Sequence, residues 1–163
     1  MQKAVTIADH GAGNLASVVR AFEHLGATVS VLSDPAQLAH ADRLVLPGQG
    51  AFRDCIGRLN SSGLSDAVRA HIATGRPYLG ICVGLQLLFE RGLEHGSHAG
   101  LGVLKGECVP LPRTVGLKIP HMGWNQVERA GGRSHPWLDS IADGSWYYFV
   151  HSYHVVPTGD VAV

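Results

Sequence analysis

The sequence predicts an α/β domain with an open, mostly parallel sheet that carries helices on both faces. Strand-like and helix-like segments alternate through the first half of the chain, which is the pattern of a parallel sheet. The 163 residues, 45% hydrophobic and 16% charged, can bury one core of ordinary size. Beyond Phe89, glycine-separated segments such as Gly123–Arg129 and Trp146–Val156 indicate antiparallel strands or hairpins.

The first strand and helix are marked by a change in hydrophobic period. Ala4–Ala8 is a short apolar run with β-branched residues, and the breaker-rich residues 9–14 follow it. From Asn14, a suitable N-cap, apolar residues recur at helical spacing until Gly26. The segment therefore predicts a strand, a tight loop and an amphipathic helix.

The same arguments extend the alternation to residue 82. Short apolar runs predict three more strands, at Thr28–Leu32, Arg43–Leu46 and Tyr78–Ile81. Helical signals predict a turn opened by Asp34 and Pro35, a helix over Ala51–Asn60, and a helix from Leu64 to near Gly75.

Charge and composition exclude several functional classes. Thirteen Lys plus Arg balance thirteen Asp plus Glu, so no basic field for nucleic acid is present. No apolar run reaches the roughly 18 residues of a membrane span, and residues 1–8 contain no signal-peptide core. We therefore expect a cytoplasmic protein. Cys55, Cys82 and Cys108 lack metal-ligand spacing, and the ten His form no HxxxH or CxxH cluster, so no metal or other cofactor is implied.

The clearest chemical signal is a cysteine at a turn between a strand and a helix. Tyr78–Phe89 is interpreted as strand, sharp turn and helix, with Cys82 at the apex between Gly80 and Gly84. This is a nucleophile elbow with sulfur in place of oxygen, and the helix N-terminus favours the reactive thiolate. The alternative is a small buried cysteine between packing glycines. Cys55 and Cys108 have no such setting and are interpreted as packing residues.

A nucleophile that attacks an amide needs hydrogen-bond donors aimed at the developing oxyanion. The backbone N–H of Val83, directly after Cys82, is one candidate. A second is the loop Pro47–Phe52, because it follows a parallel strand and so lies at the same sheet edge as Cys82. Alone, its Pro-Gly-x-Gly pattern is only a turn signature.

These segments resemble the class I, triad-type glutamine amidotransferases. The elbow Gly80–Gln86, the loop Pro47–Phe52 and the opening loop Ile7–Asn14 carry the resemblance. Two later strings, Pro120–Asn125 and Tyr147–Tyr153, are similar to the glutaminase subunits of imidazole glycerol phosphate synthases in histidine biosynthesis. The resemblance covers essentially the whole chain.

The resemblance implies hydrolysis of glutamine to glutamate and ammonia through a γ-glutamyl thioester on Cys82. Implied oxyanion-hole donors are the backbone N–H groups of Val83, Gln49 and Gly50. Implied contacts to the amino-acid head of glutamine come from Gln86 and the backbone of Ser152 and Tyr153.

The resemblance also implies a heterodimer in which ammonia passes to a cyclase subunit, a (β/α)8 barrel. The interface residues implied near the ammonia passage are Pro120, Met122, Trp124 and Tyr148. An apolar lining suits ammonia, which must be shielded from water, although the same cluster would suit any protein interface.

One departure from the family pattern concerns the catalytic His and Glu, which lie in a His-Pro-Glu motif. This sequence has no such string, since His135 and Pro136 are followed by Trp137. His121, His151 and His154 match, or lie beside, strings that precede the motif, so none is assigned as general base. We expect residues 1–163 to be one C-terminally truncated amidotransferase domain with an exposed sheet edge. Its turnover should be several orders of magnitude low, because acid–base assistance contributes roughly 10² to 10⁴.

Three alternatives remain open at this stage. Another class I glutaminase would share the elbow, but the Pro120–Asn125 and Tyr147–Tyr153 strings argue against it. A non-catalytic partner-binding subunit, with Cys82 as a relic, is favoured by the missing His and Glu. A general cysteine hydrolase is the third, although nothing in the sequence indicates a peptide-binding cleft.

Overall fold

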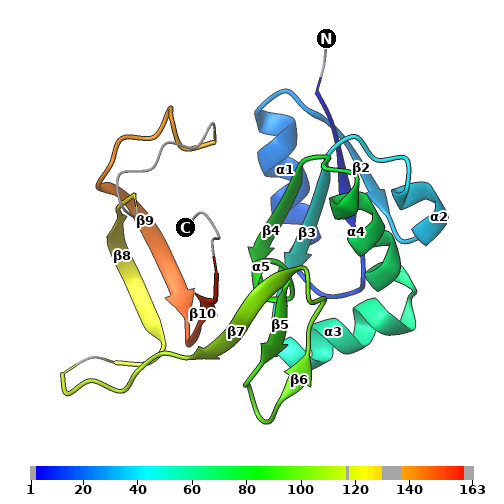
Figure 1. Cartoon of the computed structure of the whole chain (residues 1–163). Coiled ribbons are helices and arrows are strands. Elements are labelled where there is room, and N and C mark those ends of the chain that lie inside the picture. The colour runs from blue at the N-terminus through cyan, green and yellow to red at the C-terminus, as the bar shows by residue number, and fades with distance from the viewer. Residues whose placement is uncertain (1–2, 117, 130–136, 160–163) are drawn as a thin grey trace.

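A four-stranded parallel sheet organises the first half of the chain (Figure 1). The computed structural model describes residues 3–116, 118–129 and 137–159. The strands are β1 (Ala4–Ala8), β2 (Thr28–Leu32), β3 (Leu44–Gly48) and β4 (Tyr78–Cys82), in the order β2-β1-β3-β4. Every pairing among them is parallel, and β4 lies at one edge. The fold class predicted from the sequence is confirmed.

Helices cover both faces of this sheet. Their bounds are α1 (Leu15–His24), α2 (Pro35–Leu38), α3 (Phe52–Ser61), α4 (Leu64–Ala73) and α5 (Val83–Gln86). On one face, apolar residues of α1 pack against Val5, Ile7 and Val45. On the other, residues of α2, α3 and α4 pack with Leu44 and Leu46, which are 1% and 0% exposed. Successive side chains of β1 and β3 thus pack into two hydrophobic cores, one on each face of the sheet.

Side-chain caps explain where α1 and α2 begin. The Asn14 side chain accepts a hydrogen bond from the Ser17 N–H at 3.2 Å, which caps α1 as predicted. Asp34 caps α2 in the same way, accepting from the Ala36 N–H at 2.9 Å, and Pro35 occupies the first helical position. Up to residue 82, the predicted bounds of the strands and helices lie within two residues of the observed bounds.

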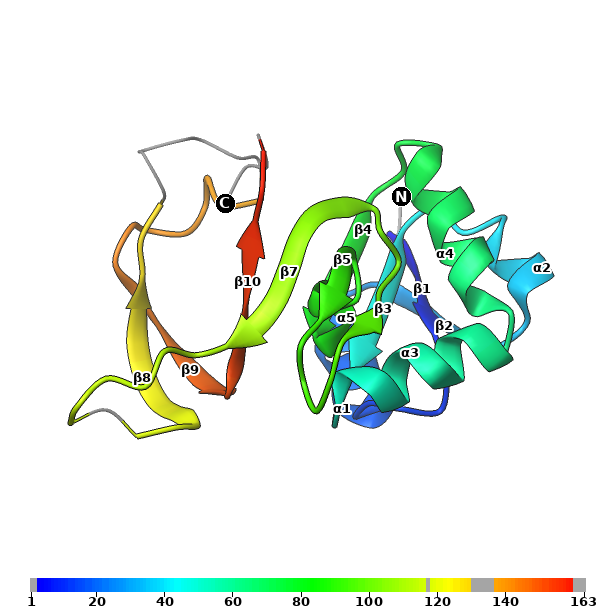
Figure 2. The same cartoon turned by 60° about the horizontal axis from the view of Figure 1, so that its bottom comes forward.

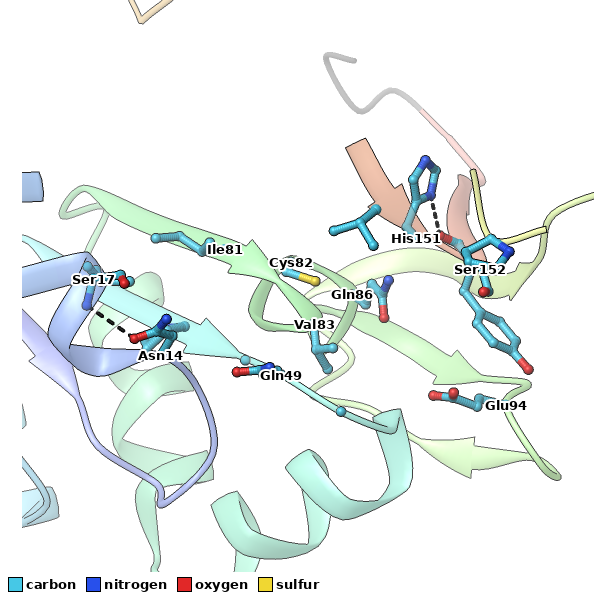
Figure 3. Close-up of a pocket in the computed structure, with 17 residues that line it drawn as sticks. Asn14, Ser17, Gln49, Ile81, Cys82, Val83, Gln86, Glu94, His151 and Ser152 are labelled. Atoms are coloured by element: carbon cyan, nitrogen blue, oxygen red, sulfur yellow. Dashed lines mark hydrogen bonds between the residues drawn. The ribbon is translucent and has the colours of Figure 1, made fainter. Parts of the chain in front are cut away.

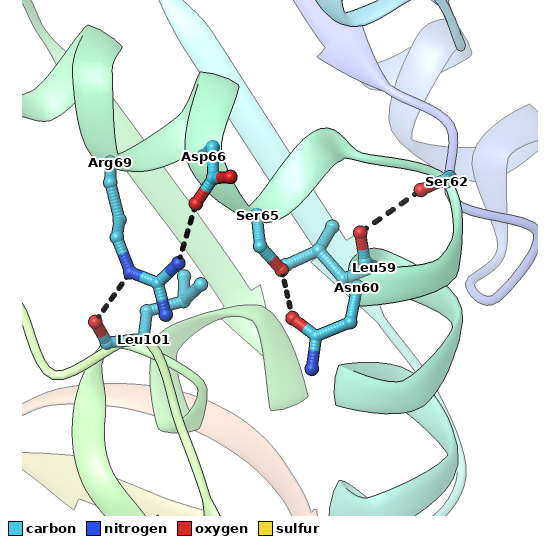
Figure 4. Close-up of polar contacts among 7 residues, drawn as sticks. All are labelled: Leu59, Asn60, Ser62, Ser65, Asp66, Arg69 and Leu101. Atoms are coloured by element: carbon cyan, nitrogen blue, oxygen red, sulfur yellow. Dashed lines mark hydrogen bonds and ion pairs between the residues drawn. The ribbon is translucent and has the colours of Figure 1, made fainter.

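Polar contacts fix the corner between α3 and α4 (Figure 4). The Ser65 hydroxyl donates to the side-chain oxygen of Asn60, and the Ser62 hydroxyl donates to the Leu59 carbonyl at 3.1 Å. Arg69 on α4 pairs with Asp66 at 3.0 Å and donates to the Leu101 carbonyl at 2.8 Å. Arg69 therefore ties the helical layer to a loop that lies 32 residues further along the chain.

The second half forms a mixed sheet and a separate hairpin. The mixed sheet has the order β10-β7-β5-β6, with β5 (Phe89–Gly92), β6 (His98–Ala99), β7 (Leu104–Pro110) and β10 (Tyr153–Pro157). β8 (His121–Val127) and β9 (Ser145–His151) form an antiparallel hairpin, which Figure 2 shows standing apart from the helices. The predicted antiparallel strands are confirmed, although the segment Trp146–Val156 is divided into two strands at Ser152.

The helix predicted after Cys82 is shorter than expected. It ends at Gln86, and Phe89 begins a strand instead of continuing the helix to residue 89. The reason is tertiary, because the Leu87 carbonyl accepts from the Leu101 N–H at 2.7 Å and the Leu88 carbonyl accepts from the Val103 N–H at 2.8 Å. The Gly84 carbonyl, which would accept from the Leu88 N–H in a continued helix, accepts from the Tyr78 hydroxyl at 3.0 Å, and Phe89 pairs with Leu104 of β7. Helical spacing was therefore a wrong guide over Leu87–Phe89.

Leu59 tests the larger core. Replacing this fully buried side chain by Ala should lower the free energy of unfolding by about 2–5 kcal/mol, since it leaves a cavity between packed helices. Leu25→Ala is the control, because Leu25 is 79% exposed and its loss should cost less than about 0.5 kcal/mol. Urea denaturation measures both, and equal midpoints for the two variants would contradict the core described above.

Candidate active site

Cys82 lies at the turn between β4 and α5 in a strained backbone conformation. Its φ is +55° and its ψ is −118°, values that a residue with a side chain seldom adopts. The thiol is exposed, whereas the next residue, Val83, is only 4% exposed. The elbow geometry predicted from the sequence is confirmed. Because α5 has a single turn, its dipole is small. The turn therefore contributes mainly by presenting the Cys82 sulfur to solvent.

The glycines beside Cys82 are required by close backbone contacts. A Cβ at Gly84 would lie 1.9 Å from the Leu46 carbonyl oxygen of β3. A Cβ at Gly80 would lie 2.6 Å from the backbone nitrogen of Leu85. Since real Cβ atoms do not approach backbone this closely, only glycine lets the elbow fold against β3.

The other two cysteines are buried. Cys55 and Cys108 are each 1% exposed, and desolvation by burial raises the pKa of the Cys55 thiol and raises that of Cys108 to about 12. Cys108 is a packing residue, as predicted. Cys55 has an additional role, because its thiol donates to the Gln49 carbonyl at 3.3 Å and holds the candidate oxyanion loop to α3.

A pocket of about 610 Å³ opens beside Cys82, between the ends of β3 and β4 and the bend that joins β9 to β10 (Figure 3). It brings together eight residues predicted from the sequence: Gln49, Gly50, Cys82, Val83, Gln86, Pro120, Ser152 and Tyr153. Met122, Trp124 and Tyr148 do not line it. Among the described residues, no group of three or more His, Cys, Asp or Glu could hold a metal ion.

Glu94 is a pocket residue that the sequence did not reveal. Its carboxylate accepts from the Phe52 N–H at 2.7 Å, across 42 residues of sequence. The residue before Phe52, Ala51, has no side-chain oxygen to cap α3, so Glu94 supplies the missing acceptor at the end of the Pro47–Phe52 loop. Glu94 is the sole carboxylate among the described residues of this pocket. No local pattern marks it, because the contact depends entirely on tertiary structure.

Asn14, Ser17 and His151 also line the pocket and were not predicted as site residues. Asn14 was identified as a helix cap, a role that it does have, and as the last residue of the loop Ile7–Asn14. Among these three, the His151 ring nitrogen Nδ1 lies 2.9 Å from the Tyr153 carbonyl oxygen. His135 and Pro136 lie outside the described residues.

The β8–β9 hairpin has two different faces. Strand alternation places Met122, Trp124, Tyr148 and Val150 on one face, where each is between 56% and 67% exposed. Trp124 and Tyr148 are cross-strand partners whose ring centroids lie 5.8 Å apart. Three of the four predicted interface residues therefore share an exposed aromatic face, and Pro120 lies at its base beside the pocket.

Comparison with known proteins identifies the family. The model of glutamine amidotransferase class-I matches residues 6–162. The chain is 50% identical over 156 residues to imidazole glycerol phosphate synthase subunit HisH of Salinibacter ruber, covering 93% of this chain and 71% of that protein. It is 47% identical to the HisH subunit of Syntrophotalea carbinolica, covering 94% and 76%. The chain belongs to the class I glutamine amidotransferase family, among the HisH subunits. The resemblance stated from the sequence is thereby confirmed.

The fold agrees with that of solved amidotransferases. A crystal structure described as a glutamine amidotransferase superposes with a TM-score of 0.72 at 17% identity, covering 96% of this chain and 75% of that one. Within the described part of this amidotransferase chain, no helix has the length and apolar character required to cross a membrane.

Gly84→Ala tests the contact between the elbow and β3. The substitution should lower the free energy of unfolding by about 3 kcal/mol, because the new Cβ displaces the Leu46 backbone. Gly57→Ala is a matched control within α3, where nothing lies within 4 Å of the added Cβ. That variant should be stabilised by roughly 0.5–1 kcal/mol. Thermal denaturation distinguishes the two, and a stabilised Gly84→Ala would contradict the described contact.

The three thiols should differ strongly in alkylation rate. In the folded protein at pH 8, iodoacetamide should modify Cys82 first, since Cys108 with a pKa of about 12 has a thiolate fraction on the order of 10⁻⁴. Peptide mass spectrometry over time measures each site. Repeating the reaction in urea is the control, because unfolding should equalise the three rates.

Proposed function

We propose that this chain is the glutaminase subunit of an imidazole glycerol phosphate synthase, acting in the cytoplasm as one domain over residues 1–163. It releases ammonia from glutamine and passes it to a cyclase subunit. The observation that carries the proposal is the strained, exposed Cys82 at the pocket that Gln49, Gly50 and Gln86 also line. The relationship to HisH subunits supports this particular synthase over other amidotransferases.

In the proposed reaction, the Cys82 thiolate attacks the amide carbon of the glutamine side chain. The amide oxygen becomes an oxyanion that accepts hydrogen bonds from the backbone N–H groups of Val83 and of Gln49–Gly50. The carbon–nitrogen bond then breaks, and the nitrogen takes up the proton that the thiol released and leaves as ammonia. Water finally cleaves the thioester, giving glutamate and the free thiol.

The pocket also has groups suited to the amino-acid head of glutamine. Gln86 and the backbone of Ser152 and Tyr153 offer hydrogen bonds to the carboxylate and ammonium groups. Glu94 is the acidic side chain that faces the same pocket, so a substrate with an ammonium group is favoured there.

The residues of this sequence supply a nucleophile and oxyanion donors but no His-Pro-Glu string. We assign no general base, and we expect acylation of Cys82 to be easier to observe than steady-state turnover. A glutamine analogue that carries a chloroketone reports this directly, because binding of its amino-acid head holds the chloroketone at Cys82 and makes the alkylation fast and saturable.

The test compares that analogue with iodoacetamide in the presence of an imidazole glycerol phosphate synthase cyclase subunit. The analogue should modify Cys82 at a saturable rate that glutamine suppresses, and glutamate release should be lost in Cys82→Ala. Equal, unsaturable modification of Cys82 by both reagents, together with binding of the cyclase, would overturn the glutaminase proposal in favour of a non-catalytic binding subunit.

The cyclase should dock on the aromatic face of the β8–β9 hairpin. Tyr148→Ala should weaken binding about 10- to 30-fold, as is typical for a central aromatic residue of an interface. Tyr147→Ala is the matched control, because the neighbouring tyrosine is on the opposite face of the same strand and should change affinity less than about threefold. Isothermal titration calorimetry measures both, and an equal loss would place the interface elsewhere.

A further inference from the structure

Two histidines pair on the inner face of the β8–β9 hairpin, opposite its aromatic face. His121 and His151 are cross-strand partners, and His121 Nδ1 lies 2.9 Å from His151 Nε2. Phe149 covers them on the same face, with its ring centroid 5.2 Å from that of His121 and 5.8 Å from that of His151. Both imidazoles are partly buried. Their mutual orientation is therefore fixed by packing as well as by the hydrogen bond.

The Tyr153 carbonyl determines the proton positions in this pair. It lies 2.9 Å from His151 Nδ1, and because a carbonyl only accepts, Nδ1 carries the hydrogen (Figure 3). In neutral His151 the other nitrogen, Nε2, is then an acceptor, so His121 donates from Nδ1. The result is a directed chain of hydrogen bonds from His121 through His151 to the Tyr153 carbonyl.

This chain ends on backbone that lines the candidate glutamine pocket. Ser152 separates β9 from β10, and its carbonyl accepts from the Leu111 N–H at 2.9 Å. His151, Ser152 and Tyr153 all line the pocket. At its other end, His121 directly follows Pro120, which lines the pocket, and precedes Met122 on the exposed face. One hydrogen-bonded pair thus connects β8 with the bend at Ser152.

We propose that His121 and His151 are positioning residues that set the Ser152–Tyr153 backbone for the head group of glutamine and transmit displacement of the hairpin to it. The inference rests on the proposed glutaminase function. A partner that binds the aromatic face moves β8 and β9 as a unit, and the imidazole pair carries that movement to the Tyr153 carbonyl. Neither imidazole exchanges a proton with the substrate in this arrangement.

Two conservative substitutions of His121 separate positioning from a general structural effect. The amide nitrogen of Asn can take the place of Nδ1, whereas that of Gln extends to the place of Nε2. His121→Asn should therefore preserve the donor to His151, and His121→Gln should lose it. His154→Gln is the control, since His154 belongs to β10 and does not line the pocket.

The readout is modification of Cys82 by the chloroketone analogue of glutamine, with and without the cyclase subunit. For His121→Gln, the analogue concentration at half-maximal rate should rise about five- to tenfold, the effect of one lost hydrogen bond. The limiting rate and the iodoacetamide rate should stay within about twofold, because Cys82 itself is unchanged. The cyclase should lower the half-maximal concentration for the wild-type chain and for His121→Asn, but not for His121→Gln.

Equal half-maximal concentrations for Asn, Gln and wild-type chains would overturn the positioning role. A parallel fall in the limiting rate would also overturn it, since that result indicates a chemical role. If the cyclase still lowers the half-maximal concentration for His121→Gln, the histidine pair does not transmit displacement of the hairpin. If the wild-type chain itself shows no saturable modification, the proposed glutaminase function fails instead, and the two failures are thus distinguishable.

Discussion

The close approach of the elbow to the end of β3 is the constraint on which the rest of the site depends. Gly84 packs onto the Leu46 carbonyl so tightly that no side chain fits between them. A Cβ at Gly48 would likewise lie 2.7 Å from the Gly84 nitrogen. This contact holds Cys82 at positive φ and places the loop that follows β3 beside it. Strain at Cys82 is thus balanced by packing of the two strand ends.

The loop after β3 is then held from two further directions. The Cys55 thiol anchors the Gln49 carbonyl from α3, and the Glu94 carboxylate anchors the Phe52 N–H from the segment after β5. With the carbonyl of Gln49 directed at Cys55, the conformation of the next peptide depends on Gly50, whose φ of +94° is open to glycine but strained for other residues. The elbow, α3 and the segment after β5 therefore define one short turn.

The sequence alone predicted the parallel half of the fold well, because Ala4–Ala8, Thr28–Leu32 and the helix capped by Asn14 are determined by local period and capping. It failed at Leu87–Phe89, where hydrogen bonds from residues 101–104 and the pairing of Phe89 with β7 replace the helix. The elbow at Cys82 was predictable since its glycines and cysteine are contiguous. Glu94 and the histidine pair were not, because their contacts span 42 and 30 residues.

The strict alternation of the hairpin has a consequence for how this protein can change over evolutionary time. Substitutions at every second position of β8 and β9 alter the outward surface while the inward row stays constant, so the exposed aromatic face can change without altering the histidine pair. Insertions behave in the opposite way. One additional residue ahead of His121 would shift the strand by half a repeat, direct Trp124 inward and turn His121 out to solvent. Selection should therefore tolerate exchange of residue types in this hairpin far more readily than any change in its length.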